Sequence, residues 1–178
     1  MGVDHDPAMI DCAKKRYINK CSTDKLNFIT ADAYHLPFDD ATVDGVMATS
    51  LTGCLSFPDK FFREIYRVLR QGGFAIMTFT NRQSLLLKIN SYFRNIMPST
   101  GELKDHNFSF HLYEQQQVKK DLEKIGFAVV QVYYYNFFLN WGDRLLPPRS
   151  WAVRLESQKN FKIQRRLGRN FIIKAQKM

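Results

Sequence analysis

The chain has 178 residues and a formal net charge of +9, with 45% hydrophobic and 24% charged residues. This composition predicts one globular domain with a sizeable core, and the sequence contains no internal repeat or low-complexity segment. The three cysteines, Cys12, Cys21 and Cys54, are widely spaced, which argues against a disulfide framework and a zinc or other metal site. No run predicts a signal peptide or a membrane span, so we expect a cytoplasmic protein.

The positive charge lies mainly at one end of the chain. From Gly142 to Met178 there are ten Lys or Arg and two Asp or Glu, a net charge of +8, whereas the first 141 residues carry sixteen and fifteen, a net charge of +1. Such asymmetry can mark a surface for nucleic acid or an anionic membrane. The simpler interpretation is the solvated face of a late helix and strand, and we therefore expect no DNA or RNA partner.

The N-terminal residues predict a strand followed by a helix. Gly2-Val3-Asp4 resembles the end of a strand, and Ala8 to Tyr17 has helical spacing with Pro7 at a favourable first position. An acidic residue at such a strand end can accept hydrogen bonds from ribose hydroxyls in nucleotide-binding α/β folds. The alternative is that Asp4 or Asp6 only caps the helix.

The stretch from Asn27 to Asn81 predicts a βαβ unit in a parallel sheet. Its three short apolar runs are rich in β-branched and aromatic residues, as buried strands are: Phe28–Thr30, Val43–Thr49 and Phe74–Phe79. The helix between the second and third runs has one apolar face formed by Phe61, Ile65, Val68 and Leu69. We expect Arg67 and Arg70 in its last turn and its end at Gly72-Gly73.

Beyond Thr80 the pattern predicts two more helices and two more strands. The first helix spans Gln83 to Ile96, with Leu85, Leu86, Ile89 and Phe93 on its inner side, and the second spans Gln115 to Ile125 and ends at Gly126. A strand follows from Phe127 to Phe138, then a long connection from Asn140 to Asn160 and a last strand from Asn170 to Ala175. The aromatic residues Tyr133, Tyr134, Tyr135 and Phe137 could stack on bases, but alternate strand residues face opposite ways, so core packing is favoured.

Several of these segments, taken in order, resemble one family. They are Asp32-Ala33, Leu36-Pro37-Phe38, Asp44 at a strand start, and the run from Glu64 to Gly73. Their order and spacing are similar to class I S-adenosylmethionine (SAM)-dependent methyltransferases, in particular the ubiquinone/menaquinone-biosynthesis-like, type 11 branch. The resemblance extends from Gly2 to Lys177. It implies a Rossmann-like α/β domain over residues 1–178 with a terminal antiparallel strand pair, and substrate-covering insertions at residues 81–112 and 138–160.

The resemblance also implies SAM as the cofactor and assigns residues to it. Asp4 would hold the ribose and Met9 would pack against the adenine. The Asp32 carboxylate would take the adenine amino group, with the Ala33 backbone beside it. Thr49 and Ser50, after the fourth strand of the family, would lie at the methionine end, near the reacting methyl group. The alternative for Ser50 is a strand-end cap.

One family feature is missing. The family opens with a strand, a Gly-rich loop of the G-x-G-x-G kind and a helix, whereas Met1 falls inside what would be the second strand and no such loop occurs later. The missing strand lies centrally in the family's sheet, between the second and fourth strands. We therefore expect an N-terminally incomplete sheet with two unpaired rows of backbone groups, and interpret the chain as the larger C-terminal part of a methyltransferase domain.

The expected function is methyl transfer from SAM to a small-molecule or lipid-like acceptor. A hydroxyl or acidic-carbon acceptor benefits from a general base, for which His35, His106 and His111 are the candidates, though none is assigned as catalytic. Two alternatives remain open. One is a non-catalytic methyltransferase remnant that acts as a protein-interaction module, with self-association through the exposed sheet edges, and the other is a nucleic-acid-directed methyltransferase.

Overall fold

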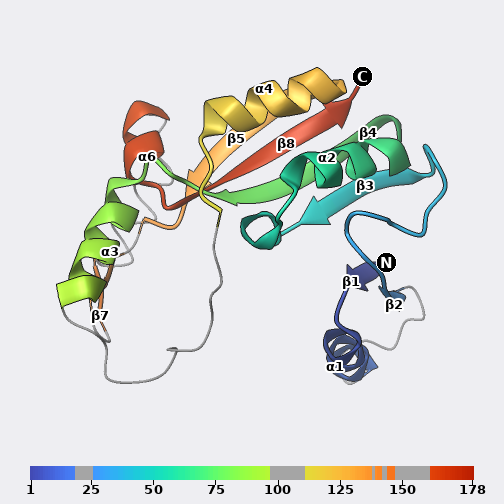
Figure 1. Ribbon diagram of the computed structural model, residues 1–178, viewed down its shortest axis with the longest axis horizontal. Helices are drawn as coiled ribbons and strands as arrows, with labels where there is room; N and C mark the ends of the chain where they lie inside the picture. Colours follow the sequence, from blue (N-terminus) through green and yellow to red (C-terminus); the bar gives the residue numbers. More distant parts are fainter. Residues whose placement is uncertain (19–25, 97–110, 138, 142–143, 147–160) are drawn as a thin grey trace.

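The computed structural model describes residues 1–18, 26–96, 111–137, 139–141, 144–146 and 161–178, and their strands form three separate sheets (Figure 1). The largest sheet has the strand order β3-β4-β8-β5, with β3 at Val43–Ala48, β4 at Leu69–Thr80, β5 at Phe127–Tyr135 and β8 at Asn170–Lys177. A second sheet pairs β1 (Gly2–Asp4) with β2 (Phe28–Thr30), and a third pairs β6 (Leu139–Trp141) with β7 (Arg144–Leu146). The chain therefore has the mixed α/β architecture that the sequence predicted.

The two-stranded β1-β2 sheet is parallel, with Gly2 opposite Phe28 and Asp4 opposite Thr30. Helix α1 (Pro7–Ile18) connects towards β2 and packs against it, and the rings of Tyr17 and Phe28 meet edge to face with their centroids 5.9 Å apart. Pro7 is the first residue of the helix, as predicted.

In the four-stranded sheet, β3 and β4 are parallel, whereas β8 runs antiparallel to both β4 and β5. The expected terminal antiparallel pair is thus confirmed. Helices α2 (Pro58–Val68) and α4 (Gln115–Ile125) cover one face of this sheet (Figure 1). The main core lies between them and the sheet, and its fully buried side chains include Phe62, Ile65, Met77, Phe79, Leu122, Phe171 and Ile173.

The end of α2 differs from the prediction. The helix ends at Val68, Leu69 is already extended and pairs with Val43, and β4 continues through Gly72, whose φ of 76° lies in the left-handed region. Gly72-Gly73 therefore belongs to an irregularity at the start of β4, because sheet pairing begins directly after the helix. Arg70 is outside the helix, and its guanidinium lies 2.6 Å from the Asp44 carboxylate on β3.

The C-terminal strand also completes the end of α2. The Lys177 ammonium group donates hydrogen bonds to the carbonyl oxygens of Tyr66 at 2.7 Å and Leu69 at 2.8 Å, and it lies over the Tyr66 ring. Carbonyl groups at a helix C-terminus lack intrahelical donors and carry partial negative charge, so a lysine there is stabilising. Helix α4 follows the prediction fully and ends at Gly126, where a φ of 115° and the nearby Tyr66 hydroxyl leave no room for a side chain.

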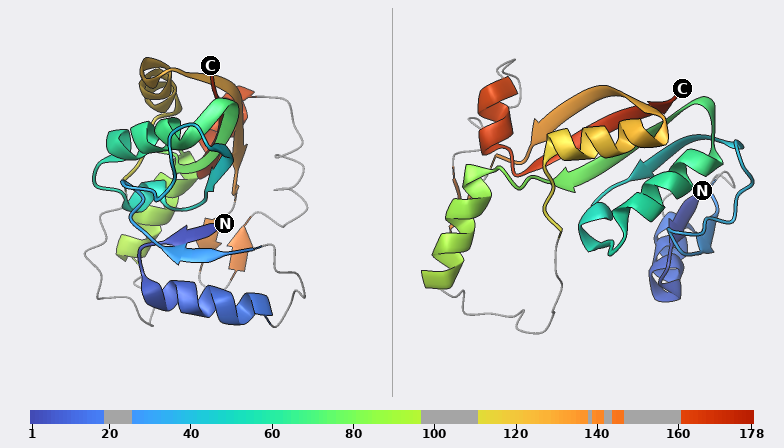
Figure 2. Two further views of the ribbon diagram at one scale, coloured as in Figure 1. Left: turned by 90° about the vertical axis from the view of Figure 1, so that its right-hand side faces the viewer. Right: turned by 45° about the horizontal axis from the view of Figure 1, so that its top comes forward.

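Helix α3 (Leu85–Ile96) and helix α6 (Phe161–Leu167) lie together beyond the end of the large sheet (Figures 1 and 2). The predicted inner side of α3 is wrong in part. Leu86 packs against the core, but the side chains of Leu85 and Ile89 are 44% and 40% exposed. The side chain of Phe93 and most of the two expected insertions lie outside the described residues.

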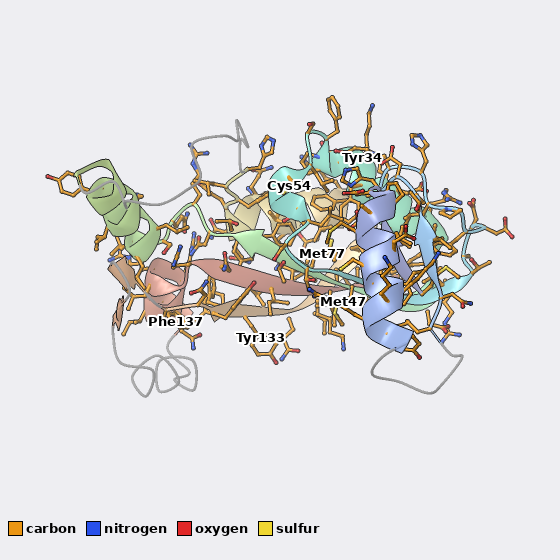
Figure 3. The ribbon with its side chains drawn as sticks, turned by 90° about the horizontal axis from the view of Figure 1, so that it is seen from below. Tyr34, Met47, Cys54, Met77, Tyr133 and Phe137 are labelled. Atoms are coloured by element: carbon orange, nitrogen blue, oxygen red, sulfur yellow. The ribbon has the colours of Figure 1, made fainter. Side chains whose placement is uncertain are left out.

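The β1-β2 pair and the four-stranded sheet are not joined by any strand among the described residues (Figure 2). Among the described residues, the outer edges of β1 and β3 therefore have no strand partner. The face of the large sheet opposite α2 and α4 carries two well-exposed side chains, Met47 at 72% and Tyr133 at 52% (Figure 3). Tyr134, the next residue, is buried on the core face, in line with the alternation expected for a strand.

Candidate cofactor and acceptor site

Two carboxylates meet at the ends of neighbouring parallel strands. Asp4 is the last residue of β1, and Asp32 follows the end of β2. The Ala31 N–H donates a hydrogen bond of 2.9 Å to the Asp4 carbonyl oxygen, which keeps the two strand ends together. In open parallel sheets, ligands bind outside the carboxyl ends of the strands. The structure thus brings together two of the residues that the sequence predicted for the cofactor.

The Asp4 and Asp6 side chains have different tasks. One Asp6 carboxylate oxygen accepts a 2.8 Å hydrogen bond from the Ala8 N–H in the first turn of α1, so Asp6 is the helix cap. One Asp4 oxygen accepts a 2.9 Å hydrogen bond from the Asp6 N–H, which fixes the turn between β1 and α1. The Asp4 side chain remains 42% exposed, so its second oxygen is accessible to a ligand. The capping alternative therefore applies to Asp6.

Asp32 lies in a short turn that exposes its carboxylate. One oxygen accepts a 2.9 Å hydrogen bond from the Tyr34 N–H, and the other is 3.6 Å from the His35 imidazole. The side chain is 57% exposed. Ala33, beside it, packs against the core and anchors the turn.

Glu64 and Arg67, two charged residues on α2, hold the next part of this loop. The Glu64 carboxylate accepts hydrogen bonds from the Leu36 N–H at 2.6 Å and from the Arg67 guanidinium at 2.7 Å. Arg67 also donates to the carbonyl oxygens of Leu36 and Phe38 and to the Asp40 carboxylate. The hydrogen bond from Arg67 holds the pKa of Glu64 below its usual range, against the effect of burial, while Glu64 and Asp40 raise the pKa of Arg67. The sequence predicted Arg67 in the last turn of the helix but gave no sign of its contacts with Glu64, Leu36 and Asp40.

A small polar cavity lies at the ends of β3 and β4. Its volume is about 100 Å³, and its lining includes Ser50, Thr52, Thr78, Thr80, Tyr135 and Asn170. Ser50 has a φ of 59°, in the left-handed region, and its N–H donates a 2.7 Å hydrogen bond to the Thr78 hydroxyl. The buried Thr52 hydroxyl donates to the Thr78 carbonyl oxygen at 2.6 Å. The backbone of Ser50 is thus held by the neighbouring strand.

The lining of this cavity is polar but carries no ionic side chain. Tyr135 shares a hydrogen bond with Thr78, and burial raises the pKa of its phenol, an effect that this hydrogen bond partly opposes. The cross-strand register places Thr80, Asn170 and Tyr135 in one row across three strands. Sequence reasoning missed Thr78, Tyr135 and Asn170, although polar residues at the ends of three strands were a usable signal.

The other predicted site residues lie outside this cavity. Thr49 and Met9 are exposed, Met9 at 55% on the surface of α1. The His35 side chain is 87% exposed and beside Asp32. His111 is exposed, and its backbone N–H donates to the Gly53 carbonyl oxygen at 2.8 Å. His106 falls outside the described residues.

A larger cavity of about 280 Å³ lies on the other side of the sheet, between α2, α4 and the segment before α4. Asp59, Glu114, Asp121 and Arg82 line it. In the part of the chain that the structure describes, no group of His, Cys, Asp or Glu side chains could hold a metal ion. The described helices include none with the length and apolar character needed to cross a membrane.

The fold resembles that of SAM-dependent methyltransferases, and Asp4 and Asp32 lie at strand ends where ligands bind in such sheets. A family described as a methyltransferase domain matches residues 1–77. The chain is 28% identical over 151 residues to the demethylmenaquinone methyltransferase of Lactiplantibacillus plantarum, covering 77% of this chain and 63% of the relative. It is 30% identical over 130 residues to the mitochondrial 2-methoxy-6-polyprenyl-1,4-benzoquinol methylase of Caenorhabditis elegans, covering 70% and 45%. The chain is thus similar to methyltransferases named for quinone biosynthesis.

Solved structures agree on the fold. A methyltransferase from Bacillus halodurans superposes with a TM-score of 0.67 at 16% identity, covering 98% of this chain and 81% of that chain. The magnesium protoporphyrin IX methyltransferase of Synechocystis, determined with bound S-adenosylhomocysteine, gives 0.65 at 12% identity, covering 99% and 63%. The chain spans 63% and 45% of the lengths of the two curated relatives described above.

Proposed function

We propose that this protein takes part in methyl transfer from SAM to a neutral, oxygen-bearing small-molecule or lipid-like acceptor. Two observations carry the proposal: exposed carboxylates follow the neighbouring parallel strands β1 and β2, and a neutral polar cavity lies at the ends of β3 and β4. SAM, when bound, supplies a methyl group on a sulfonium, which is already activated. The chain's own task is then to orient the acceptor and exclude water.

The residues present fit the adenosine half of SAM. Asp4 and Asp32 each keep an exposed carboxylate oxygen at adjacent strand ends, where the ribose hydroxyls and the adenine amino group would find acceptors. The Ala33 backbone would lie beside the adenine, and the exposed Met9 would cover it. The methionine half has Thr49 and Ser50 available, but the sequence contains no Gly-rich loop that could approach it closely.

The cavity beside Ser50 supports the acceptor part of the proposal. Its hydroxyl groups and the Asn170 carboxamide can both donate and accept hydrogen bonds, whereas a charged acceptor would find no counterion among its lining residues. A phenolic or enolic oxygen suits this lining. Two relatives are named for demethylmenaquinone and for a polyprenyl benzoquinol, which are oxygen-bearing compounds of this kind. We extend this class of methyl acceptor to this chain.

The open edges of β1 and β3 support the proposal that this chain is the larger C-terminal part of a catalytic domain. One strand placed between them would make the sheet continuous and satisfy both rows of backbone groups. We expect the genomic sequence upstream of Met1, translated in frame, to encode an apolar strand followed by a Gly-rich loop. A close in-frame stop codon without this pattern would contradict the proposal.

Calorimetric titration with SAM tests the function. The 178-residue chain should bind SAM orders of magnitude more weakly than an extended chain, because it lacks several backbone hydrogen bonds worth roughly 1 kcal/mol each. The extended chain should bind SAM and methylate a soluble hydroquinone. Tight binding by the short chain would mean that another segment, or a second copy, supplies the missing contacts. Failure of the extended chain to bind SAM would refute the proposed function.

An interaction module is the second candidate, supported by the unpaired β3 edge and by Met47 beside it, which is 72% exposed. Such an edge can pair with a strand of another chain.

A further inference from the structure

We propose that α3 and α6 together form a surface that docks on an anionic lipid bilayer. This α3–α6 surface consists of Leu85, Lys88 and Ile89 on α3 and Lys162, Ile163 and Arg166 on α6. It lies at the end of the large sheet away from β1 and β2 (Figure 1). The inference does not depend on the proposed methyl transfer, and its test uses neither SAM nor an acceptor.

The first support is a stripe of exposed apolar side chains on α3. Leu85, Ile89 and Tyr92 are 44%, 40% and 65% exposed, and their spacing of four and three residues places them along one line of the helix. Ile163 on α6 adds a further aliphatic side chain that is 41% exposed. A helix that turns a large apolar stripe towards solvent is typical of helices that lie in the interface of a bilayer.

The second support is the charge around this stripe. The exposed cations here are Lys88 on α3 and Lys162 and Arg166 on α6, and neither helix contains Asp or Glu. Helix α4 is different, because its three lysines are accompanied by Asp121 and Glu123, which pair with Lys124 and Lys119. Among the described residues, the α3–α6 surface thus combines cations and exposed apolar side chains with no acidic residue on either helix. Such a surface complements anionic lipid headgroups.

The third support is a rigid connection between the two helices. The Asn81 carboxamide donates hydrogen bonds to the carbonyl oxygens of Arg165 at 2.8 Å and Gly168 at 2.7 Å, and the Arg165 guanidinium donates to the Gln83 side chain at 2.6 Å. The Ser84 hydroxyl also donates to the Leu167 carbonyl oxygen. Asn81 and Ser84 are buried. The two helices are therefore presented as one unit, and docking does not require them to be ordered first.

The side-chain chemistry favours a bilayer over a nucleic acid. Single-stranded nucleic acids are held by aromatic groups that stack on bases, together with cations along the backbone. Leu85, Ile89 and Ile163 cannot stack in this way, but they can enter the boundary between headgroups and acyl chains. A membrane-docked surface would also suit an acceptor that resides in a bilayer.

Vesicle flotation with the 178-residue chain tests the inference. The probes are vesicles of phosphatidylcholine alone and of phosphatidylcholine with about 30% phosphatidylglycerol, at about 0.15 M salt. The chain should float with the anionic vesicles and remain unbound with the neutral ones. Binding should weaken as the salt concentration rises, because salt screens the attraction between the cations and the anionic headgroups. Each cation near the surface is expected to change partitioning roughly fivefold.

Two variants and a matched control locate the surface. The triple variant Lys88→Gln, Lys162→Gln, Arg166→Gln and the double variant Leu85→Ser, Ile89→Ser should each lower partitioning roughly tenfold or more. The control, Lys119→Gln, Lys120→Gln, Lys124→Gln, removes the same charge from α4 and should bind like the wild type. Equal losses in the control and the α3–α6 variants would overturn the assignment of the surface. Absence of wild-type flotation, or equal flotation with neutral vesicles, would overturn the proposal whether or not the variants fold.

Discussion

The Glu64 carboxylate and the Leu36 N–H, 28 residues apart in sequence, are joined by a hydrogen bond of 2.6 Å. Glu64 is 12% exposed at its side chain, and Arg67 on the next turn of α2 supplies its counter-charge. The loop that carries Asp32 is thereby fastened to α2, and through it to the core.

We expect Glu64→Gln to lower the free energy of unfolding by about 1–3 kcal/mol, because a mostly buried, charge-assisted acceptor is lost. Urea denaturation monitored by circular dichroism measures the change. Glu123→Gln on α4 is the control, since its ion pair with Lys119 is half exposed and should contribute little. An equal effect of both substitutions would show that Glu64 is not specially important.

The pH dependence of stability follows from the same Glu64–Arg67 pair. The hydrogen bond from Arg67 favours the ionised form of Glu64 and so lowers its pKa in the folded protein. A group with a depressed folded-state pKa stabilises the protein fully above its unfolded-state value and loses this contribution as the pH falls through the folded-state value. The stability of the wild type should therefore decline below about pH 4.5 more steeply than that of Glu64→Gln. Parallel curves for the two proteins would contradict the assignment.

Asp4 and Asp6 should separate in their effects. Asp6→Ala should destabilise α1 by about 1 kcal/mol through loss of its cap, with little change in SAM affinity of an extended chain. Asp4→Ala should weaken SAM binding in that chain by about 1–3 kcal/mol, because the ribose hydroxyls lose a charged acceptor. Calorimetry and thermal melts of both variants distinguish the two roles. Unchanged affinity in Asp4→Ala would leave that residue as a turn-forming acid only.

Thr78 is expected to organise the acceptor cavity. Thr78→Val should lower the free energy of unfolding by about 1 kcal/mol, because the Ser50 N–H loses the hydroxyl of buried Thr78 as its acceptor in a partly buried hydrogen bond. Thr78→Ser keeps the hydroxyl and is the control. In an extended, active chain, Tyr135→Phe should raise KM for a hydroquinone acceptor. Burial raises the pKa of Tyr135, so its phenol should ionise at higher pH than that of a free tyrosine. Equal stability of the two Thr78 variants would argue against this role.

The regular elements were predictable because local pattern and tertiary environment agree in them. Helix α4 begins, buries Val118 and Leu122 and ends at Gly126 as its periodicity indicates. Helix α2 was predicted too long, since no local signal shows that Leu69 pairs with Val43. Leu85 and Ile89 have the spacing of a buried stripe, but spacing alone does not distinguish a core-facing stripe from a solvent-facing one.

The candidate site was predictable in its carboxylates and less so in its cavity. Asp4 and Asp32 follow apolar runs directly, and parallel strands bring such positions to one edge. Thr78, Tyr135 and Asn170 come from strands whose register the sequence does not specify, so their meeting depends on the antiparallel placement of β8.

The open β3 edge should allow self-association at high protein concentration. Met47 is 72% exposed beside this edge, and a lysine at an exposed strand position discourages edge pairing. Met47→Lys should therefore shift the chain towards monomer in analytical ultracentrifugation without lowering its melting temperature. The control is Val130→Lys on β5, which is 56% exposed at the opposite edge of the sheet. An equal shift in both variants would point to general charge repulsion.

Nucleic-acid binding should be negligible at physiological salt. If the basic C-terminal segment neutralised nucleic-acid phosphates, its affinity for DNA or RNA would fall steeply as the ionic strength rises. Fluorescence anisotropy with labelled RNA and DNA should show no saturable change at about 0.15 M salt. A salt-sensitive complex that is lost in Arg165→Ala, Arg166→Ala would reverse this expectation.

The position of β8 has a consequence for assembly of the large sheet. Strand β8 lies between β4 and β5, and among the described strands it alone connects them, since β4 and β5 do not pair with each other. Until β8 is in place, the Phe79 and Tyr134 side chains lack Phe171, which packs against both rings. Closure of the large sheet therefore depends on pairing between residues far apart in the sequence, which is intrinsically slow to form.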